Sequence, residues 1–383
     1  MNITVAGCGM TKFGELWAAS PRSLAREAVE QAIGESGVEK KSIQGLFVAN
    51  MLAGMLGMQA HLGALFSEEL GLFVPAYTVE GACASGGLAV HAGVMSILSG
   101  QYDTVVVLGV EKMTDHKPES VSSALMGAGS NEERLAGATF PGLYAMLARS
   151  HMEKFGTTEK QMAAVAVKNH FHASFNSNAQ FSNCITIDRV LKSSCIADPL
   201  KLLDCSPVTD GAAAIVLKRE TTNGKQSGVH IIASQIATDT LGLAQRKSLL
   251  ELSATKRAAQ RAFTQAGISE KDIDIAEVHD CFTIAEILAI EDIGFGKKGQ
   301  VARDIEKGAY TLGTARHVVV NSSGGLKGCG HPIGATGVKQ IVEIVNQLRG
   351  VCGKRQVKNA TVGLAHNVGG SGATAVVHIV QKG

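Results

Sequence analysis

Hydrophobic residues recur at helical spacing between Ser23 and Gly37, directly ahead of a short apolar run. The side chains that share one face of this predicted helix are Leu24, Ala25, Ala28, Val29, Ala32 and Ile33. Pro21 stands where the start of a helix tolerates proline, and Gly37 is a typical stop. The apolar segment from Ile43 to Ala49 then predicts a buried strand.

The same helix-and-strand pattern returns in residues 253–278. The coinciding residues are Ala28 with Ala258, Ala32 with Ala262, Gly37 with Gly267, Lys41 with Lys271, Ile43 with Ile273 and Val48 with Val278. At a different offset, the helix ending at Gly100 matches the helix ending at Gly350, and Thr104 matches Thr361. We therefore predict that the chain is internally duplicated.

Each half is predicted to run strand, helix, strand, helix, strand, helix, strand, strand. This alternation is typical of α/β proteins with a largely parallel sheet, whose sites lie beyond the carboxyl ends of the strands. Residues 111–205 fit neither copy, and we interpret them as an inserted loop domain that covers the site. The predicted division is 1–110 with 206–222 for the N-terminal half, 111–205 for the insert and 223–383 for the C-terminal half.

A glycine-rich turn in residues 321–337 joins the apolar run 317–320 to a predicted helix. His331 stands at the entrance to that helix, and Pro332 suits its first turn because proline lacks the N–H that would be unpaired there. Superposing the two halves places Gly87 on Gly337, and residues 81–83 opposite residues 331–333. We expect Cys83 and His331 to lie at equivalent helix N-termini and to meet across a pseudo-twofold axis.

Cys83 follows a short predicted strand and precedes the helix from Leu88 to Leu98. A thiol at a helix N-terminus faces unpaired N–H groups and the positive end of the helix dipole, which lower its pKa and favour the thiolate. The same N–H groups suit an oxyanion. The position also suits an inert buried cysteine, so this residue alone leaves both interpretations open.

Three more candidates stand at predicted strand ends. His279 and Cys281 follow the strand 273–278, and the equivalent position of the first half is Ala49, which indicates a function peculiar to one half. His366 enters a second glycine-rich turn, residues 366–372. A histidine at a strand end is often only structural, so these residues gain weight from their shared location.

Composition narrows the class of protein. The chain has 383 residues, 45% of them hydrophobic, and 36 Lys plus Arg against 34 Asp plus Glu, so it lacks the basic field that nucleic acid demands. Eight cysteines without a C-x-x-C pair disfavour a disulfide scaffold and a zinc knuckle, and we expect no metal. Reduced thiols and the lack of a visible targeting segment lead us to expect a cytoplasmic protein.

Two uncharged stretches approach the length of a membrane span, residues 46–67 and 81–101. The first contains Asn50, Gln59 and His61, the second is rich in Gly, Ala and Ser, and neither has an asymmetry of flanking Lys and Arg. We therefore expect buried helices, of the kind found at subunit interfaces, and no membrane span.

Taken together, the motifs resemble the thiolase superfamily over essentially the whole chain. They are Cys83-Ala-Ser85, His279-Asp-Cys-Phe282, Gly330-His-Pro332 and the glycine turn after His366, in family order. The sequences at His279 and His366 are most similar to the branch of sterol carrier protein thiolases and archaeal acetoacetyl-CoA thiolases. The resemblance implies a five-layer α-β-α-β-α fold, no permanently bound cofactor and coenzyme A as a substrate.

The resemblance also implies chemistry: acyl transfer from coenzyme A to a thiolate, then condensation with acetyl-CoA or thiolytic cleavage of a 3-ketoacyl-CoA. Cys83 would be the nucleophile and His331 its base. His279, where many thiolases have Asn, would help His331 hold a thioester oxygen, while backbone N–H groups near Cys83 and residues 368–370 would hold the acyl oxygen.

This sequence departs from the family pattern at one position. Most thiolases carry a second cysteine in the last glycine motif, and His366 stands there instead. Either His366 or Cys281 could move the proton on the acetyl carbon, and the sequence favours neither.

The departure leaves other functions open. A Cys-His-His set resembles decarboxylating ketosynthases, and transfer to an acceptor other than coenzyme A is a further option. An alternative of another class is a catalytically weak scaffold that binds acyl-CoA. Acyl chain length and coenzyme A contacts are not legible, whereas the family likeness and the uncharged helices suggest a homodimer or homotetramer.

Overall fold

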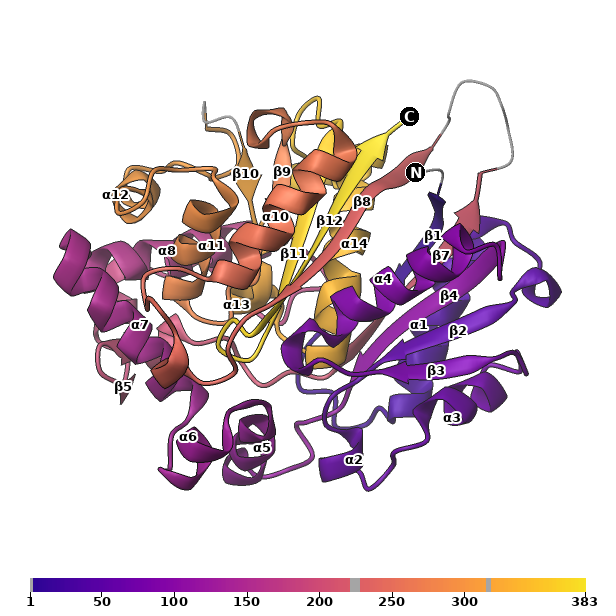
Figure 1. Ribbon diagram of the computed structural model, residues 1–383, viewed down its shortest axis with the longest axis horizontal. Coiled ribbons are helices and arrows are strands. Elements are labelled where there is room, and N and C mark those ends of the chain that lie inside the picture. Colours follow the sequence, from indigo (N-terminus) through magenta and orange to yellow (C-terminus); the bar gives the residue numbers. More distant parts are fainter. Residues whose placement is uncertain (1–2, 221–227, 315–317) are drawn as a thin grey trace.

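The computed structural model describes residues 3–220, 228–314 and 318–383. Its strands form one mixed sheet in the order β10-β9-β11-β12-β8-β1-β7-β4-β2-β3 (Figure 1). The order is symmetric about the β8-β1 junction, where Ile3 pairs with Ile231 and Thr4 with His230 among the described residues. The chain therefore consists of two five-stranded halves, and the predicted duplication is confirmed.

The N-terminal half has four strands in one direction and one antiparallel strand, β7. Its strands are β1 Ile3–Met10, β2 Gly45–Ala49, β3 Ala76–Val79, β4 Thr104–Glu111 and β7 Gly211–Arg219. Its helices are α1 Pro21–Ser36, α2 Ala53–Leu56, α3 Leu62–Glu69 and α4 Ser85–Leu98, with the short 3-10 helices η1 Lys40–Ser42 and η2 Ala82–Ala84.

The C-terminal half repeats this pattern, with β12 as its antiparallel strand. Its strands are β8 Val229–Thr238, β9 Ile275–Glu277, β10 Val319–Val320, β11 Val362–Gly369 and β12 Thr374–Lys382. Its α-helices are α10 Ser253–Ala266, α11 Thr283–Ile293, α12 Val301–Glu306, α13 Gly325–Cys329 and α14 Ile333–Arg349. Its 3-10 helices are η5 Leu243–Gln245, η6 Glu270–Asp272 and η7 Gly353–Arg355. The short α13 inside the glycine-rich turn was not predicted.

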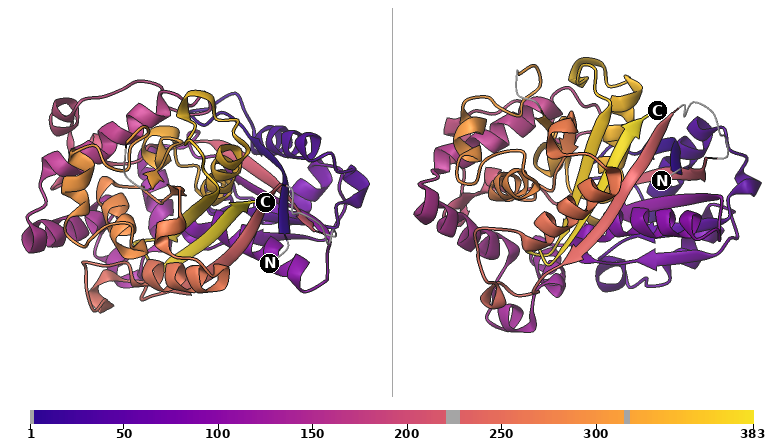
Figure 2. Two further views of the ribbon diagram at one scale, coloured as in Figure 1. Left: turned by 90° about the horizontal axis from the view of Figure 1, so that it is seen from above. Right: turned by 45° about the horizontal axis from the view of Figure 1, so that its top comes forward.

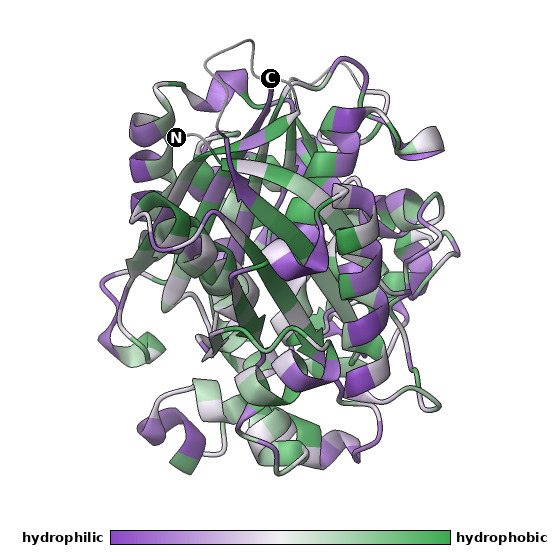
Figure 3. Ribbon diagram, turned by 90° about the vertical axis from the view of Figure 1, so that its right-hand side faces the viewer, coloured by the Kyte–Doolittle hydropathy of each residue, from purple (hydrophilic) through white to green (hydrophobic). Residues whose placement is uncertain are grey.

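Five layers result, as expected. Helices α1 and α3 cover one outer face, α10 and α11 cover the other, and α4 and α14 lie between the two halves of the sheet (Figures 1 and 2). Successive residues of a strand face different layers, so Val105 and Val107 of β4 face the central helices while Val106 and Leu108 face α1. Figure 3 shows the strands mostly green and the purple, hydrophilic residues mostly on helices and loops.

Residues between β4 and β7 form the predicted cover. They contain α5 Pro118–Leu125, η3 Met126–Ala128, α6 Asn131–Leu135, α7 Phe140–Phe155, α8 Glu159–Ala173, α9 Ile187–Leu191, β5 Cys195–Ala197, β6 Leu200–Lys201 and η4 Leu202–Asp204. In Figure 1 they extend along the lower and left side. The division into 1–110 with 206–222, 111–205 and 223–383 remains our proposal, and its boundary at 222 lies outside the described residues, as does His317.

Residues 46–67 contain most of β2, the short α2, which has no buried residue, and most of α3, so the expectation of buried helices is wrong for part of this stretch. Residues 81–101 contain η2 and the largely buried α4. Within the described ranges, no helix is long and apolar enough to cross a membrane.

Two glycines let the central helices touch backbone to backbone. A Cβ atom on Gly86 of α4 would lie 2.6 Å from the Gly337 nitrogen, and one on Gly337 of α14 would lie 2.2 Å from the Gly87 nitrogen. Glycine is therefore required here for close approach rather than for a special φ angle. The contact lies near the N-termini of both helices and brings the turns that precede them together.

We expect Gly337→Ala to lower the free energy of unfolding by about 1–3 kcal/mol, because the added methyl group overlaps a backbone nitrogen that cannot rotate away. Gly34→Ala in α1 is the matched control, since its Cβ meets nothing within 4 Å and should leave stability unchanged or slightly higher. Urea unfolding of both variants measures the difference. Equal stability of the two variants would contradict the close contact.

Candidate active site

Cys83 lies in η2, between the end of β3 and the start of α4. The preceding residue, Ala82, has a φ of 55°, in the left-handed region that side chains seldom adopt. Ser85 holds this turn, because its hydroxyl accepts from the Gly81 N–H at 3.0 Å and donates to the Ala82 carbonyl at 2.6 Å. The strained turn presents the cysteine at the carboxyl edge of the sheet.

His331 occupies the equivalent place before α14. Its backbone N–H donates to the Thr209 hydroxyl at 3.0 Å, and its Nδ1 lies 2.7 Å from the Thr336 hydroxyl. That hydroxyl donates its single proton to the Pro332 carbonyl at 3.0 Å, so it must accept from His331. Nδ1 therefore carries the imidazole proton, and Nε2 is left as an acceptor.

The two turns meet across the pseudo-twofold axis. The Cys83 sulfur, a ring nitrogen of His331 and a ring nitrogen of His279 all lie within 4.8 Å of one another. The two imidazole rings are edge to face, with centroids 5.1 Å apart at 85°. A substrate carbonyl placed between them can touch the thiol and both histidines.

His279 follows β9, and its Nδ1 lies 3.2 Å from the side-chain nitrogen of Asn367 on β11. Its Nε2 is buried and has no hydrogen-bond partner in the part of the chain that the structure describes. Burial, with the nearby His331 and His366, lowers the pKa of His279 well below its usual range. This imidazole is therefore neutral.

Cys281 and His366 are placed differently. Cys281 lines the same cavity as Cys83 and His331, whereas the His366 ring points to the outer layer and its Nε2 lies 2.8 Å from the Thr255 hydroxyl on α10. Its Nδ1 accepts from the His279 N–H at 3.5 Å. Both nitrogens of His366 are thus occupied away from the cavity.

The cavity beside Cys83 has a volume of about 220 Å³ and mostly apolar walls. Its lining residues are Cys83, Met113, Pro118, Val121, Ser122, Leu125, Phe140, Pro141, Tyr144, Cys205, Ser206, Pro207, Val208, Cys281, Phe282, His331, Ile333 and Gly370. Tyr144 of α7 stacks on Phe282, with centroids 4.6 Å apart, and donates to the Gly370 carbonyl at 3.1 Å. Segments 113–144 and 205–208 thus enclose Cys83, Cys281 and His331, and the apolar walls suit an acyl chain.

Comparison with known proteins decides the family. The family model described as "Thiolase, N-terminal domain" matches residues 3–221, and the one described as "Thiolase C-terminal domain-like" matches residues 236–382. The chain belongs to the thiolase family.

Similar proteins span its whole length. An acetyl-CoA acetyltransferase of Methanothermobacter thermautotrophicus is 46% identical over 100% of both chains, and one of Methanocaldococcus jannaschii is 42% identical over 99% of both. Sterol carrier protein 2 of Bos taurus is 33% identical over 98% of this chain and 71% of its own. Among solved structures, an Ltp2-ChsH2(DUF35) aldolase has a TM-score of 0.84 at 23% identity, covering 100% of this chain and 98% of its own, and shows the shared fold.

Electrostatics in this thiolase-family site differ from the expectation for Cys83. Burial raises the pKa of its thiol to about 12, although backbone N–H groups of Gly370 and Cys83 oppose the shift. Burial also lowers the pKa of His331 to about 3. The expected helix-lowered thiol pKa is therefore wrong for the resting site, in which both groups are neutral.

We expect alkylation of Cys83 by iodoacetamide to accelerate about tenfold per pH unit between pH 7 and 9, because only the thiolate reacts and its fraction rises steadily below a high pKa. Mass spectrometry of the digested protein measures the rate, with the exposed Cys195 as an internal reference. A rate that levels off near neutral pH would instead indicate a thiolate paired with a protonated His331.

A metal does not fit the cluster of Cys83, His279 and His331, even though the spacing is permissive. The Asn367 oxygen accepts from the Gly87 N–H, so the amide nitrogen faces Nδ1 of His279. Because that nitrogen can only donate, the proton of this imidazole resides on Nε2. Neither nitrogen then offers a free lone pair, which zinc requires of histidine.

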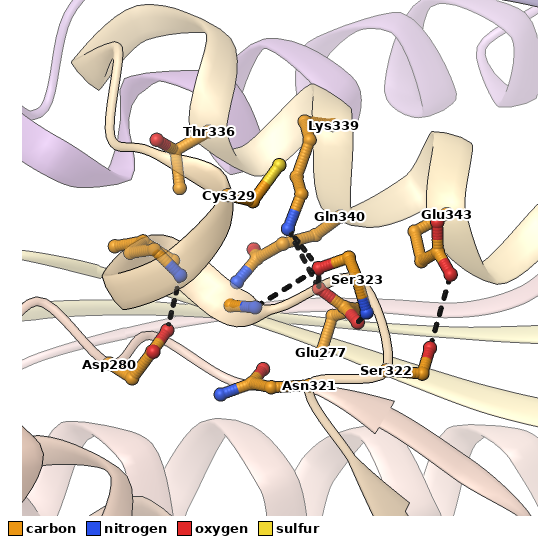
Figure 4. Close-up of polar contacts among 12 residues, drawn as sticks. Glu277, Asp280, Asn321, Ser322, Ser323, Cys329, Thr336, Lys339, Gln340 and Glu343 are labelled. Carbon is orange, nitrogen blue, oxygen red and sulfur yellow. Dashed lines mark hydrogen bonds and ion pairs between the residues drawn. The ribbon is translucent and has the colours of Figure 1, made fainter. Parts of the chain in front are cut away.

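Buried charges hold the strand ends beneath the site in this thiolase-family fold. Lys339 of α14 pairs with Glu277 at 2.9 Å and contacts Ser323, and the three side chains converge in Figure 4. Asp280 accepts from the Leu326 N–H at 2.6 Å and from Asn169 at 2.7 Å, so it ties the His279–Cys281 segment to α13 and to α8. Sequence reasoning missed these supports.

Asn367, which contacts both Cys83 and His279, is a further residue that sequence reasoning missed. A signal for it was available: residues of β11 alternate between layers, so Asn367 must face the central helices if its neighbour His366 faces α10. Thr336, in the first turn of α14, was also missed. Its position five residues after His331 is a weaker indication that its hydroxyl contacts that imidazole.

Proposed function

We propose that the chain is a thiolase-type acyltransferase that transfers an acyl group between coenzyme A and Cys83 and makes or breaks a carbon–carbon bond next to a thioester. The observation that carries this proposal is the convergence of Cys83, the acceptor Nε2 of His331 and the Cys281 thiol on one apolar cavity. The names of the archaeal relatives support acetyl-CoA as a substrate.

In the thiolytic direction, His331 accepts the Cys83 proton while the sulfur attacks the 3-keto carbon. The carbon–carbon bond then breaks, and its electron pair leaves as the enolate of acetyl-CoA, whose oxygen accepts a hydrogen bond from His279 Nε2. The Cys281 thiol protonates the enolate carbon, which releases acetyl-CoA. Condensation runs through the same steps in reverse.

Incoming coenzyme A completes the cycle. Its thiol proton passes to the Cys281 thiolate, its sulfur attacks the acyl group on Cys83, and the Cys83 sulfur recovers its proton from His331. Burial and the neighbouring Cys83 keep the pKa of Cys281 well above its usual range, which suits a proton donor. We propose Cys281 rather than His366 for this role, because only Cys281 lines the cavity.

A direct test incubates the protein with acetoacetyl-CoA and coenzyme A. We expect acetyl-CoA to form and intact-mass spectrometry to find one acetyl group, located on Cys83 after digestion. If the protein instead releases carbon dioxide from malonyl-CoA, it is a decarboxylating condensing enzyme. Binding of acyl-CoA without acylation would make it a scaffold.

We also propose where the substrate binds, how the protein assembles and where it acts. We place coenzyme A and acyl-chain contacts in segment 113–144, on the basis of the cavity walls.

We propose a homodimer or homotetramer, because β3 is an uncharged edge strand with Tyr77 half exposed, and such edges are normally covered. A role in lipid metabolism and a cytoplasmic location are proposed from the family likeness and the cysteine usage.

A further inference from the structure

One buried amide group, that of Asn367, joins both halves of the site. Its oxygen accepts from the Gly87 N–H at 2.9 Å, and its nitrogen donates to the Cys83 carbonyl at 2.9 Å. A backbone N–H can only donate, so the Gly87 contact fixes which end of the amide is oxygen. The nitrogen end, a donor, therefore faces His279.

This orientation determines where the His279 proton resides. The Asn367 nitrogen lies 3.2 Å from Nδ1 of His279, and two donors cannot share a hydrogen bond, so Nδ1 must be the acceptor. In a neutral imidazole the proton is then on Nε2. That Nε2–H is buried and has no partner within the described residues, which is costly unless a ligand accepts from it.

We propose that Asn367 is a positioning residue that holds His279 as its Nε2–H tautomer, and so makes His279 a permanent hydrogen-bond donor to the substrate thioester oxygen. The role of His279 toward a thioester rests on the proposed function, whereas the assignment of its tautomer does not. Because the same amide caps an N-terminal N–H of α4 and holds the Cys83 carbonyl, it also fixes the donor relative to the nucleophile.

The tautomer can be read in the resting protein. Histidine ¹⁵N chemical shifts, with the His279 signal assigned by its loss in His279→Asn, are expected to show a protonated Nε2 and a bare Nδ1. The reverse pattern would overturn the proposal whether or not the protein is active. An Nε2–H signal in a protein without acyl-transfer activity would leave the tautomer standing and sink the proposed function instead.

Asn367→Asp tests the catalytic consequence. A carboxylate keeps the Gly87 contact but can only accept from His279, so neutral His279 must place its proton on Nδ1 and lose the Nε2 donor. Thiolysis is then expected to fall about 10²–10³-fold as pH rises through the ¹⁵N-measured pKa of His279 in this variant, because one oxyanion donor disappears. Wild type should show no such loss.

The double variant His279→Asn with Asn367→Asp is the matched control. An asparagine at 279 has no tautomer to lose, so adding Asn367→Asp should cost only the lost hydrogen bond to the Cys83 carbonyl, a loss of no more than about tenfold that does not vary with pH. Equal losses in both backgrounds, or activity that persists while His279 of Asn367→Asp deprotonates, would show that Asn367 acts independently of His279. Thermal unfolding checks that each variant is folded.

Discussion

Cys83→Ser is expected to reduce thiolysis of acetoacetyl-CoA by about 10⁴- to 10⁶-fold, the range seen when a catalytic nucleophile is removed. The serine hydroxyl has nearly the same size, so the turn held by Ser85 should persist. Its oxygen is a far poorer nucleophile, because His331 must now remove a proton from an alcohol. Steady-state kinetics measure the loss, and thermal unfolding should show a change of a few degrees at most.

Cys195→Ser is the control, since Cys195 is exposed on β5 and lies outside the cavity. Its activity should match that of the parent protein. A Cys83→Ser variant that retains more than a tenth of the parental rate would mean that acyl transfer does not pass through this sulfur.

Cys281→Ala is expected to slow exchange of the acetyl-CoA methyl protons with deuterium oxide by about 10²–10⁴-fold, the usual contribution of a positioned acid or base. Acylation of Cys83 by acetyl-CoA should slow less, because His331 still removes the Cys83 proton and the coenzyme A thiolate can leave without a proton from Cys281. The comparison variant His366→Asn should keep exchange within a few-fold of the parent while lowering stability, since it disturbs the buried contact with Thr255. Proton NMR of the methyl signal and urea unfolding provide the two measurements.

The opposite outcome would be informative. Fast exchange in Cys281→Ala with slow exchange in His366→Asn would assign the proton transfer to His366 and require its ring to leave the outer layer. Fast exchange in both variants would remove both residues from the reaction.

Much of the fold could be predicted because its strongest signal is repetition. Two matching helix-and-strand patterns, such as Ala28 with Ala258 and Gly37 with Gly267, define equivalent elements without any knowledge of contacts. Equivalence then places Cys83 and His331 at matching helix starts, and their meeting follows from the symmetry. The short helix α13 escaped prediction because its glycine-rich sequence has no helical hydrophobic pattern.

The electrostatics of Cys83 could not be predicted in the same way. The helix start suggested free N–H groups, yet the Gly87 N–H is occupied by Asn367, a residue from the other half. Desolvation of the thiol by the residues packed around it then outweighs the remaining donors, and the pKa of the thiol rises. Both causes are contacts between segments far apart in sequence, which local patterns do not encode. The choice between Cys281 and His366 was open for the same reason.

The backbone contact between α4 and α14 at their glycines sets the smallest distance between these two helices. Because main-chain atoms of Gly86 and Gly337 already touch, the separation of sulfur and imidazole is limited by the thickness of the backbone rather than by the fit of neighbouring side chains. Substitutions elsewhere in the core can therefore lower stability without closing the space between the Cys83 sulfur and the His331 imidazole, where the thioester binds. We infer that this geometry tolerates wide divergence of its surroundings, provided that the two glycines are kept.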